Sequence, residues 1–251
     1  MVKLSKRLQM IADRVPAGSR LADIGSDHAL LPTYLAQQGV ITFGVAGEVN
    51  PGPFDAATRQ VMECGLQARI NVRLGDGLAV IQPGEVDVIT IAGMGGSLIA
   101  SILDAGKSKL QGVAKLILQP NVGEDQVRRW LNEQGWLLES EAILEEDGKI
   151  YEILTASPNG GAALESLYQD KVLPDGKVVN KARLLQMGPY LIEQAPEVWF
   201  RKWDSELAKL AMIEGQLALS EAEASKAKAQ QIGQEIQEIK EVLACLQKVK
   251  Q

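Results

Sequence analysis

The sequence predicts an α/β protein: a doubly wound sheet, parallel except for an antiparallel hairpin at its end, followed by a helical domain with a coiled-coil hairpin. Three observations predict this fold. Short runs of Val, Ile and Leu alternate with helical patterns up to residue 133, two strand patterns then follow each other directly, and no strand pattern occurs after residue 162.

The first element is a helix, predicted from Leu4, Leu8, Ile11 and Val15. These apolar residues step by four, three and four, so they share one helix face. The Pro-Ala-Gly sequence at 16–18 ends the helix. Most basic residues of this segment lie off the apolar face.

Seven strands and four further helices are predicted next. The first five strands show no apolar/polar alternation, as expected for a parallel sheet that helices cover on both faces. The last two are joined by Glu-Glu-Asp-Gly, which predicts an antiparallel hairpin. The strands are predicted at 21–24, 41–48, 70–74, 86–91, 113–118, 136–144 and 150–156, and the helices at 29–38, 53–64, 96–105 and 124–133.

Two domains are expected, at residues 1–157 and 163–251, with a linker between them. The second domain holds two apolar stripes of equal length with a polar gap between them. They predict two helices folded back as an antiparallel coiled-coil hairpin, with a single long helix or a dimeric coiled coil as alternatives. The stripes are Trp203, Leu207, Leu210 and Leu217, and Ile232, Ile236, Ile239, Leu243 and Leu246.

Composition excludes several classes of protein. Hydrophobic residues make up 46% and charged residues 23% of the chain, which is usual for a globular protein. No window approaches 18 uninterrupted apolar residues, so no transmembrane helix is expected. Cys64 and Cys245 lie far apart without a CxxC, which argues against a disulfide framework and a metal site. A reducing cytoplasm is the expected location.

The charge distribution allows one local anion-binding surface. A net charge of −6 argues against a protein that coats nucleic acid indiscriminately. The first 20 residues nevertheless hold five basic side chains and one acidic one. Lys3, Lys6 and Arg7 are therefore candidate polyanion contacts, and a solvated face is the alternative. The same two interpretations apply to Arg128 and Arg129, whereas the basic residues of the second domain, Arg183 among them, lie in surroundings that are neutral overall.

Ligand-binding residues are predicted at the carboxyl ends of four consecutive strands. The first strand ends in Asp23, Gly25, Ser26 and Asp27, a turn of small residues that can place backbone N–H groups at a ligand. Doubly wound sheets bind their ligands at this edge. Four such clusters in order are more specific than any single turn.

The next three strand ends extend this pattern. Glu48, followed by Val49, can accept from both hydroxyls of a ribose. Asp76 can accept from an adenine amino group while the N–H of Gly77 bonds a ring nitrogen. The fourth strand ends in a glycine-rich cluster, namely Ala92, Gly93, Met94, Gly95 and Gly96.

Four residues, three from these clusters and Asn121 after the fifth strand, keep two interpretations. His28, the single histidine, is either a substrate contact or proton carrier, or a residue that only begins a helix. Asp27 is either a site carboxylate or a helix N-cap. Met94 either contacts a base or packs in the wall. Asn121 either lines the substrate pocket or is a turn residue.

Several segments carry a resemblance to a known family. They are ADIGSDHALLP (22–32), GEVNPGPFDAA (47–57), RLGDGL (73–78), IAGMGGSLI (91–99), LQPN (118–121), GPYL (188–191) and FRKWDSEL (200–207). They resemble the bacterial tRNA (adenine-22-N1)-methyltransferase family, whose sheet is the Rossmann-like sheet of class I methyltransferases that use S-adenosyl-L-methionine. The resemblance covers nearly the whole chain.

The resemblance implies a role for each matched position. Asp23, Gly25, Ser26 and Asp27 match the cofactor turn, in which Asp27 replaces the usual second glycine. Further implied cofactor contacts are Glu48, Val49, Asp76, Gly77, Ala92, Gly93 and Met94. The Asn/Asp-Pro-Pro-aromatic pattern of enzymes that methylate exocyclic amines is absent after the fourth strand, which argues against amine methylation and leaves a ring nitrogen open as the acceptor.

The implied chemistry needs little machinery. N1 of adenine carries no proton, so it can attack the sulfonium methyl group in line, and catalysis is mostly positioning and electrostatics. Asp27 is the expected stabiliser of the developing positive charge, with His28 beside it, and the alternative role of Asp27 is to hold the ammonium group of the cofactor. Gly93, Gly95 and Gly96 would leave room for the base, which must be brought out of folded tRNA.

Three other functions remain open from the sequence. One is methylation of another RNA base or a small molecule. The second is a nicotinamide-dinucleotide oxidoreductase, which could also use Glu48, although the missing glycines argue against it. The third is a non-catalytic tRNA-binding protein. The sequence leaves the oligomeric state undetermined, with a monomer as the default expectation.

Overall fold

The protein consists of two compact units. The computed structural model describes residues 2–220 and 222–249, and it divides into Met1–Leu167, here the sheet unit, and Tyr168–Gln251, here the helical unit. None of the helices in the described part of the chain is long and apolar enough to cross a membrane.

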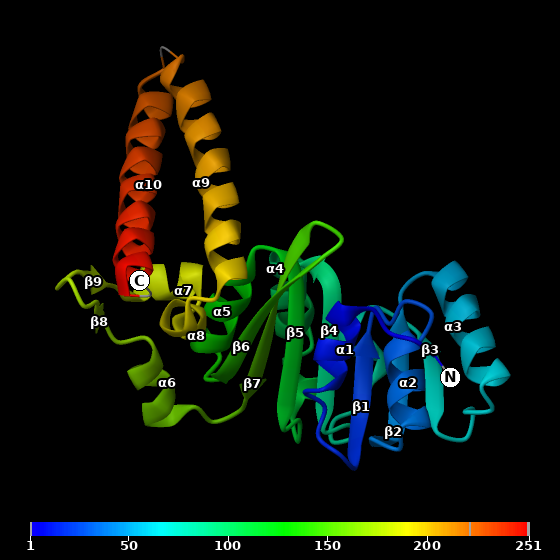
Figure 1. Ribbon diagram of the computed structural model, residues 1–251. Helices are drawn as coiled ribbons and strands as arrows, with labels where there is room; N and C mark the ends of the chain where they lie inside the picture. The colour runs from blue at the N-terminus through cyan, green and yellow to red at the C-terminus, as the bar shows by residue number, and fades with distance from the viewer. Residues whose placement is uncertain (1, 221, 250–251) are drawn as a thin grey trace. The chain divides into compact units, whose positions relative to one another are not determined.

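The sheet unit contains a seven-stranded sheet in the order β3-β2-β1-β4-β5-β7-β6 (Figure 1). Strands β1 to β5 run parallel, whereas β7 pairs antiparallel with both β5 and β6. This confirms the predicted fold. The strands are β1 (Ser19–Ile24), β2 (Ile41–Glu48), β3 (Ile70–Leu74), β4 (Val88–Gly95), β5 (Lys115–Val122), β6 (Leu137–Glu146) and β7 (Lys149–Ser157).

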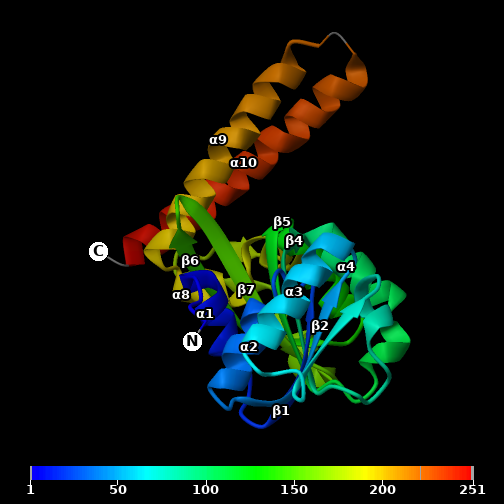
Figure 2. The same cartoon turned by 90° about the vertical axis from the view of Figure 1, so that its right-hand side faces the viewer.

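Helices cover both faces of this sheet. Helices α1, α2 and α3 lie on one face, and α4 and α5 lie on the other (Figure 2). On the first face Ile11, Leu31 and Leu35 pack against Leu21 and Ile117 of the strands, and all are buried. Each such side chain contributes about 1.5–3 kcal/mol when fully buried. The helices are α1 (Lys6–Ala12), α2 (Leu30–Gln37), α3 (Pro51–Glu63), α4 (Gly96–Ala105), α5 (Glu124–Glu133) and α6 (Gly161–Leu167), with 3-10 helices η1 (Gly77–Val80) and η2 (Lys107–Leu110).

Strands β4 and β5 continue four residues beyond their predicted ends. Ala92 pairs with Gln119, Met94 with Pro120, and Gly95 with Val122, with two register shifts between these pairs. The glycines and the Pro-Asn sequence predict a loop here. Bulges accommodate them in a distorted ladder instead, because the extra residue of a bulge needs no partner. The ligand-binding residues predicted after these two strands therefore lie in a bulged ladder and not in a loop.

A buried ion triad joins α5 to the terminal hairpin. Arg128 forms ion pairs with Glu141 of β6, at 2.6 Å, and with Glu152 of β7, and all three side chains are fully buried. The interpretation of Arg128 as a surface cation is therefore wrong. Arg129 is the neighbour that faces solvent, and it pairs with Asp125 at 3.4 Å.

The helical unit contains two long helices that pack against each other side by side (Figure 1). This confirms the predicted hairpin within one chain. At its base Trp199 is fully buried, and its indole N–H donates to the Met187 carbonyl at 2.9 Å. The elements are β8 (Lys171–Val172), β9 (Val178–Val179), α7 (Lys181–Met187), α8 (Pro189–Gln194), α9 (Glu197–Ala218) and α10 (Glu223–Val249). The two-residue strands were not expected, because they are too short to show a pattern.

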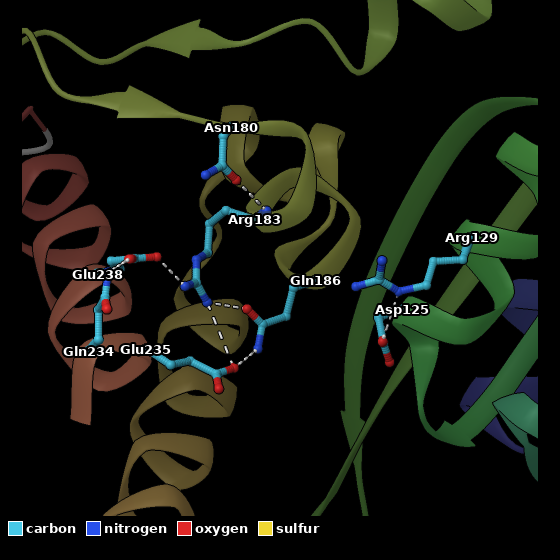
Figure 3. A network of polar contacts seen from close by, with 8 residues as sticks. All are labelled: Asp125, Arg129, Asn180, Arg183, Gln186, Gln234, Glu235 and Glu238. Atoms are coloured by element: carbon cyan, nitrogen blue, oxygen red, sulfur yellow. Dashed lines mark hydrogen bonds and ion pairs between the residues drawn. The ribbon is translucent and has the colours of Figure 1, made fainter. Parts of the chain in front are cut away.

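Arg183 ties α7 to α10 (Figure 3). Its guanidinium donates to Glu238 at 2.6 Å and to Gln186, while Glu235 lies 3.9 Å away. The Asn180 side chain caps α7 by accepting from the Arg183 N–H at 3.0 Å. Since its charge is paired inside the unit, Arg183 stabilises the base of the hairpin.

The buried triad predicts a large difference between two adjacent arginines. Substituting Arg128→Met leaves two buried carboxylates without their cation, so we expect the free energy of unfolding to fall by about 3–5 kcal/mol. The matched variant Arg129→Met removes an exposed pair and should cost about 0.3–0.5 kcal/mol. Urea unfolding of both variants measures this. Equal losses would contradict the account.

Candidate active site

The candidate site is a cavity of about 360 Å³ at the carboxyl ends of the central strands. It lies where the strand order reverses between β1 and β4, the place at which doubly wound sheets bind ligands. Nine of the predicted residues line it, namely Arg7, Asp23, Gly25, Ser26, Asp27, Ala92, Gly93, Met94 and Asn121. Leu8, Leu31 and Tyr151 line it as well, and the sequence did not identify them.

The turn after β1 requires glycine at position 25. Gly25 has a φ of 69°, and a Cβ there would lie 2.2 Å from Met94 Cε. The N–H groups of Gly25 and Ser26 both donate to the Gly47 carbonyl, at 2.9 and 3.2 Å. These bonds hold the turn against β2, while the Met94 side chain occupies the space where a side chain at position 25 would lie.

Asp23 is buried beneath this turn. Its carboxylate accepts from the Ser26 hydroxyl and from the Thr90 hydroxyl, each at 2.6 Å. Burial raises the pKa of the Asp23 carboxyl above its usual value, although these two hydrogen bonds oppose the shift. The protein thus keeps an acid in a place that disfavours its charged form.

The next three residues form a strained segment. Asp27, His28 and Ala29 have φ values of 36°, 60° and 52°, all in the left-handed region. That conformation costs roughly 1–2 kcal/mol per residue for side chains with a Cβ. Glu48 holds the segment, because its Oε1 accepts from the Asp27 N–H at 2.7 Å. Strain of this kind is often found at ligand sites.

The side chains of Asp27 and His28 point toward solvent. They are 85% and 58% exposed, and His28 Nε2 lies 3.7 Å from Asp27 Oδ1. Asp27 lines the cavity, whereas His28 does not. The strain thus presents a carboxylate at the cavity mouth.

Glu48, at the end of β2, is a second buried acid, only 6% exposed, and it lines neither this cavity nor the one between η1 and α4. Burial raises the pKa of its carboxyl, and the hydrogen bond from the Asp27 backbone opposes that shift. The following residue, Val49, is 57% exposed. An apolar side chain therefore stands in solvent directly beside a buried carboxylate.

The buried side-chain amide of Gln119 connects residues of the cavity wall formed by α1, β4 and β5. Gln119 is fully buried, and its Oε1 accepts from Arg7 Nη1 and from the Gly93 N–H, the latter at 3.1 Å. Its Nε2 donates to the Pro120 carbonyl at 2.8 Å and to Asn121 Oδ1 at 3.1 Å. Sequence reasoning gave this residue no role, although it lies in the LQPN segment (118–121) singled out above.

Helix α1 places one cation in the cavity. Glu146, from the β6–β7 hairpin, accepts from the backbone N–H groups of Lys6 and Arg7 at 2.6 and 3.2 Å. The Arg7 guanidinium lies over the Tyr151 ring, 5.4 Å from its centroid. Lys3 and Lys6 are exposed and do not line the cavity.

A second cavity, of about 390 Å³, lies between η1 and α4. Asp76 and Gly77 line it, together with the apolar side chains of Leu78, Leu98 and Ile102. The carboxylate of Asp76 is exposed at the start of η1. A flat apolar ring with polar edges fits such a site.

The two remaining glycines of the β4 cluster differ. A Cβ on Gly95 would meet open space, whereas a Cβ on Gly96 would lie 1.9 Å from the Gly123 carbonyl oxygen. Gly96 is therefore required by close backbone packing. Among the described residues, no group of three or more His, Cys, Asp or Glu side chains could hold a metal ion.

Comparison with known proteins matches this chain to one family model and to relatives with the same description. A family model described as tRNA (adenine(22)-N(1))-methyltransferase matches residues 21–241. The enzyme of that description from Bacillus subtilis is 44% identical over 96% of this chain and 98% of its own length. The crystal structure of the B. subtilis M1A22 tRNA methyltransferase has a TM-score of 0.87 at 43% identity, covering 96% of this chain and 99% of that one. A Streptococcus pneumoniae structure in complex with S-adenosyl-L-methionine has a TM-score of 0.80 at 41% identity, covering 96% and 100%.

The buried acid Asp23 predicts a pH dependence of stability. Because its folded pKa is raised, the folded state binds more protons than the unfolded state above about pH 4, and stability falls as the pH rises toward the folded pKa. Asp23→Asn removes this titration. We therefore expect the variant to gain stability relative to the unmodified protein as the pH rises. Urea unfolding across pH 4 to 8 measures this, and a difference that does not change with pH would refute it.

Proposed function

The chain belongs to the tRNA (adenine(22)-N(1))-methyltransferase family, and we propose that it methylates N1 of adenine 22 in tRNA with S-adenosyl-L-methionine as methyl donor. The observation that supports this best is the cavity between β1 and β4. One guanidinium and two carboxylates line it. That arrangement complements a cationic amino-acid ligand.

The residues present fit the amino-acid end of this cofactor. Arg7 is the one Lys or Arg among the cavity-lining residues, and the α-carboxylate is the one anionic group of the cofactor. We therefore assign Arg7 to that carboxylate, as a charge-assisted pair. Asp27 and the buried Asp23 would hold the ammonium group.

The nucleoside end fits the neighbouring residues. Glu48 would accept from the ribose hydroxyls, and its Oε1 already holds the Asp27 N–H. Val49 would pack against the adenine ring of the cofactor. Asp76 would accept from the amino group, with the Gly77 N–H bonding a ring nitrogen at the second cavity.

The chain's own task in the reaction is positioning. Bound S-adenosyl-L-methionine supplies an electrophilic methyl group on a sulfonium, which adenine N1 can attack in line without first losing a proton. Asp27, exposed at the cavity mouth, stabilises the positive charge that develops on the base. His28 beside it is a substrate contact rather than a required base, and the open space at Gly95 admits the base.

The tRNA would contact the exposed cations at the start of the chain. Lys3 precedes α1 and Lys6 begins it, both face solvent, and Arg7 of the same helix reaches the cavity. Glutamine substitutions at both lysines should flatten the salt dependence of tRNA binding, by about 0.7–0.9 per lost phosphate contact. We assign tRNA binding to the helical unit as well, and place the enzyme in the cytoplasm as a monomer.

The direct test is methyl transfer to two unmodified transcripts, one with adenine and one with guanine at position 22. Label should appear as 1-methyladenosine in the first transcript only. The Asp27→Asn variant keeps a side chain that tolerates the left-handed turn, and it should transfer at least about tenfold more slowly. If the unmodified protein binds the cofactor but transfers no methyl group, the tRNA assignment is refuted. If it binds NADH instead of the cofactor, an oxidoreductase is favoured.

The assignment of Arg7 predicts a selective loss of cofactor affinity. Arg7→Met removes a charged hydrogen-bond donor worth about 1.5–3 kcal/mol, so the Kd for S-adenosyl-L-methionine should rise at least about tenfold. Arg59→Met, which removes an exposed cation of α3, is the matched control and should leave the Kd unchanged. Titration calorimetry measures both, and an unchanged Kd for Arg7→Met would refute the role.

A further inference from the structure

We propose that Asn121 selects adenine at the target position by reading the N6 and N7 atoms of the base, and that Gln119 sets the orientation of the Asn121 amide. The inference rests on the proposed function and deepens it. It names the groups that distinguish the acceptor base, which neither the cavity nor the cofactor chemistry specifies.

Gln119 has no freedom to turn. A glutamine amide has two lone pairs on Oε1 and two hydrogens on Nε2, and all four are used by Arg7, Gly93, Pro120 and Asn121. A flipped amide would set its NH₂ group against two donors and its oxygen against two acceptors. The orientation of Gln119 is therefore fixed by its surroundings.

Gln119 in turn orients Asn121. Asn121 Oδ1 accepts from Gln119 Nε2 at 3.1 Å, and Asn121 Nδ2 donates to the Gly93 carbonyl at 2.8 Å. Each bond uses half of the capacity of that amide atom. Oδ1 keeps a second lone pair and Nδ2 keeps a second hydrogen. The residue is exposed and lines the cavity, so this donor–acceptor pair is presented to a ligand there.

A free acceptor beside a free donor matches adenine. The N6 amino group can donate to Oδ1 while N7 accepts from Nδ2, the bidentate pairing by which Asn reads adenine in nucleic acids. Guanine presents two acceptors, O6 and N7, so its O6 would face Oδ1 without a hydrogen. Contact through N6 and N7 also leaves N1 free to face the methyl donor.

The test compares two tRNAs that differ in the N7 atom of the target base, each with the unmodified protein and with variants of Asn121. One tRNA carries adenine 22 and another carries 7-deazaadenine, which lacks the N7 acceptor. For the unmodified protein, kcat/KM should fall about tenfold on the second tRNA, as expected for one lost hydrogen bond. Asn121→Ala should be slower on adenine and treat both tRNAs alike. Asn121→Asp, which cannot donate to N7, should lose or reverse the preference.

Asn71→Ala, an exposed asparagine of β3, is the matched control and should keep the tenfold preference. Cofactor affinity and thermal unfolding of both Asn121 variants show that the fold and the donor site persist. A preference that survives in Asn121→Ala, or none in the unmodified protein, overturns the inference. No methylation of either tRNA by the unmodified protein would instead overturn the proposed function.

Discussion

The four hydrogen bonds of the buried Gln119 amide join the segments on which the site depends. They connect α1 through Arg7, the end of β4 through Gly93, and the end of β5 through Asn121. These segments lie far apart in the sequence, and two of them continue the sheet as a bulged ladder. Both hydrogens and both lone pairs of the Gln119 amide are used, so the wall of the cavity is fixed before a ligand binds. Catalysis by positioning requires such preorganisation.

The site also contains features that disfavour folding of the sheet unit. Asp23 and Glu48 are buried with raised pKa values, and Asp27 begins a run of three left-handed residues. None of these favours folding of the protein alone. A cationic ligand would stabilise the charged form of the buried carboxyl groups. The Glu48 carboxylate, which we assign to the ribose, already accepts a hydrogen bond from the Asp27 N–H. Stability is provided elsewhere, by the apolar core that the helices form with the sheet.

The sequence predicted the bounds of helices and strands correctly where a local pattern specifies them. Strands β2 and β3 and helices α4 and α5 begin and end at their predicted residues, because runs of Val, Ile and Leu and helical spacing specify them. The extension of β4 and β5 was missed, since glycines and Pro-Asn usually end a strand. Gln119 lies in the LQPN segment and Glu146 in no motif, but the roles of both depend on partners in distant segments, namely Arg7 and Gly93 for Gln119 and α1 for Glu146. Such residues act through tertiary contacts, which no single window of sequence contains.

The most direct test of the account is a crystal structure of this protein with S-adenosyl-L-homocysteine. The account places the α-carboxylate within hydrogen-bond distance of the Arg7 guanidinium and the ribose hydroxyls on Glu48, with Asn121 still bonded to Gln119. A ligand whose carboxylate lies away from Arg7, or whose ribose avoids Glu48, would contradict the central claim that this cavity is built around the charges of the methyl donor.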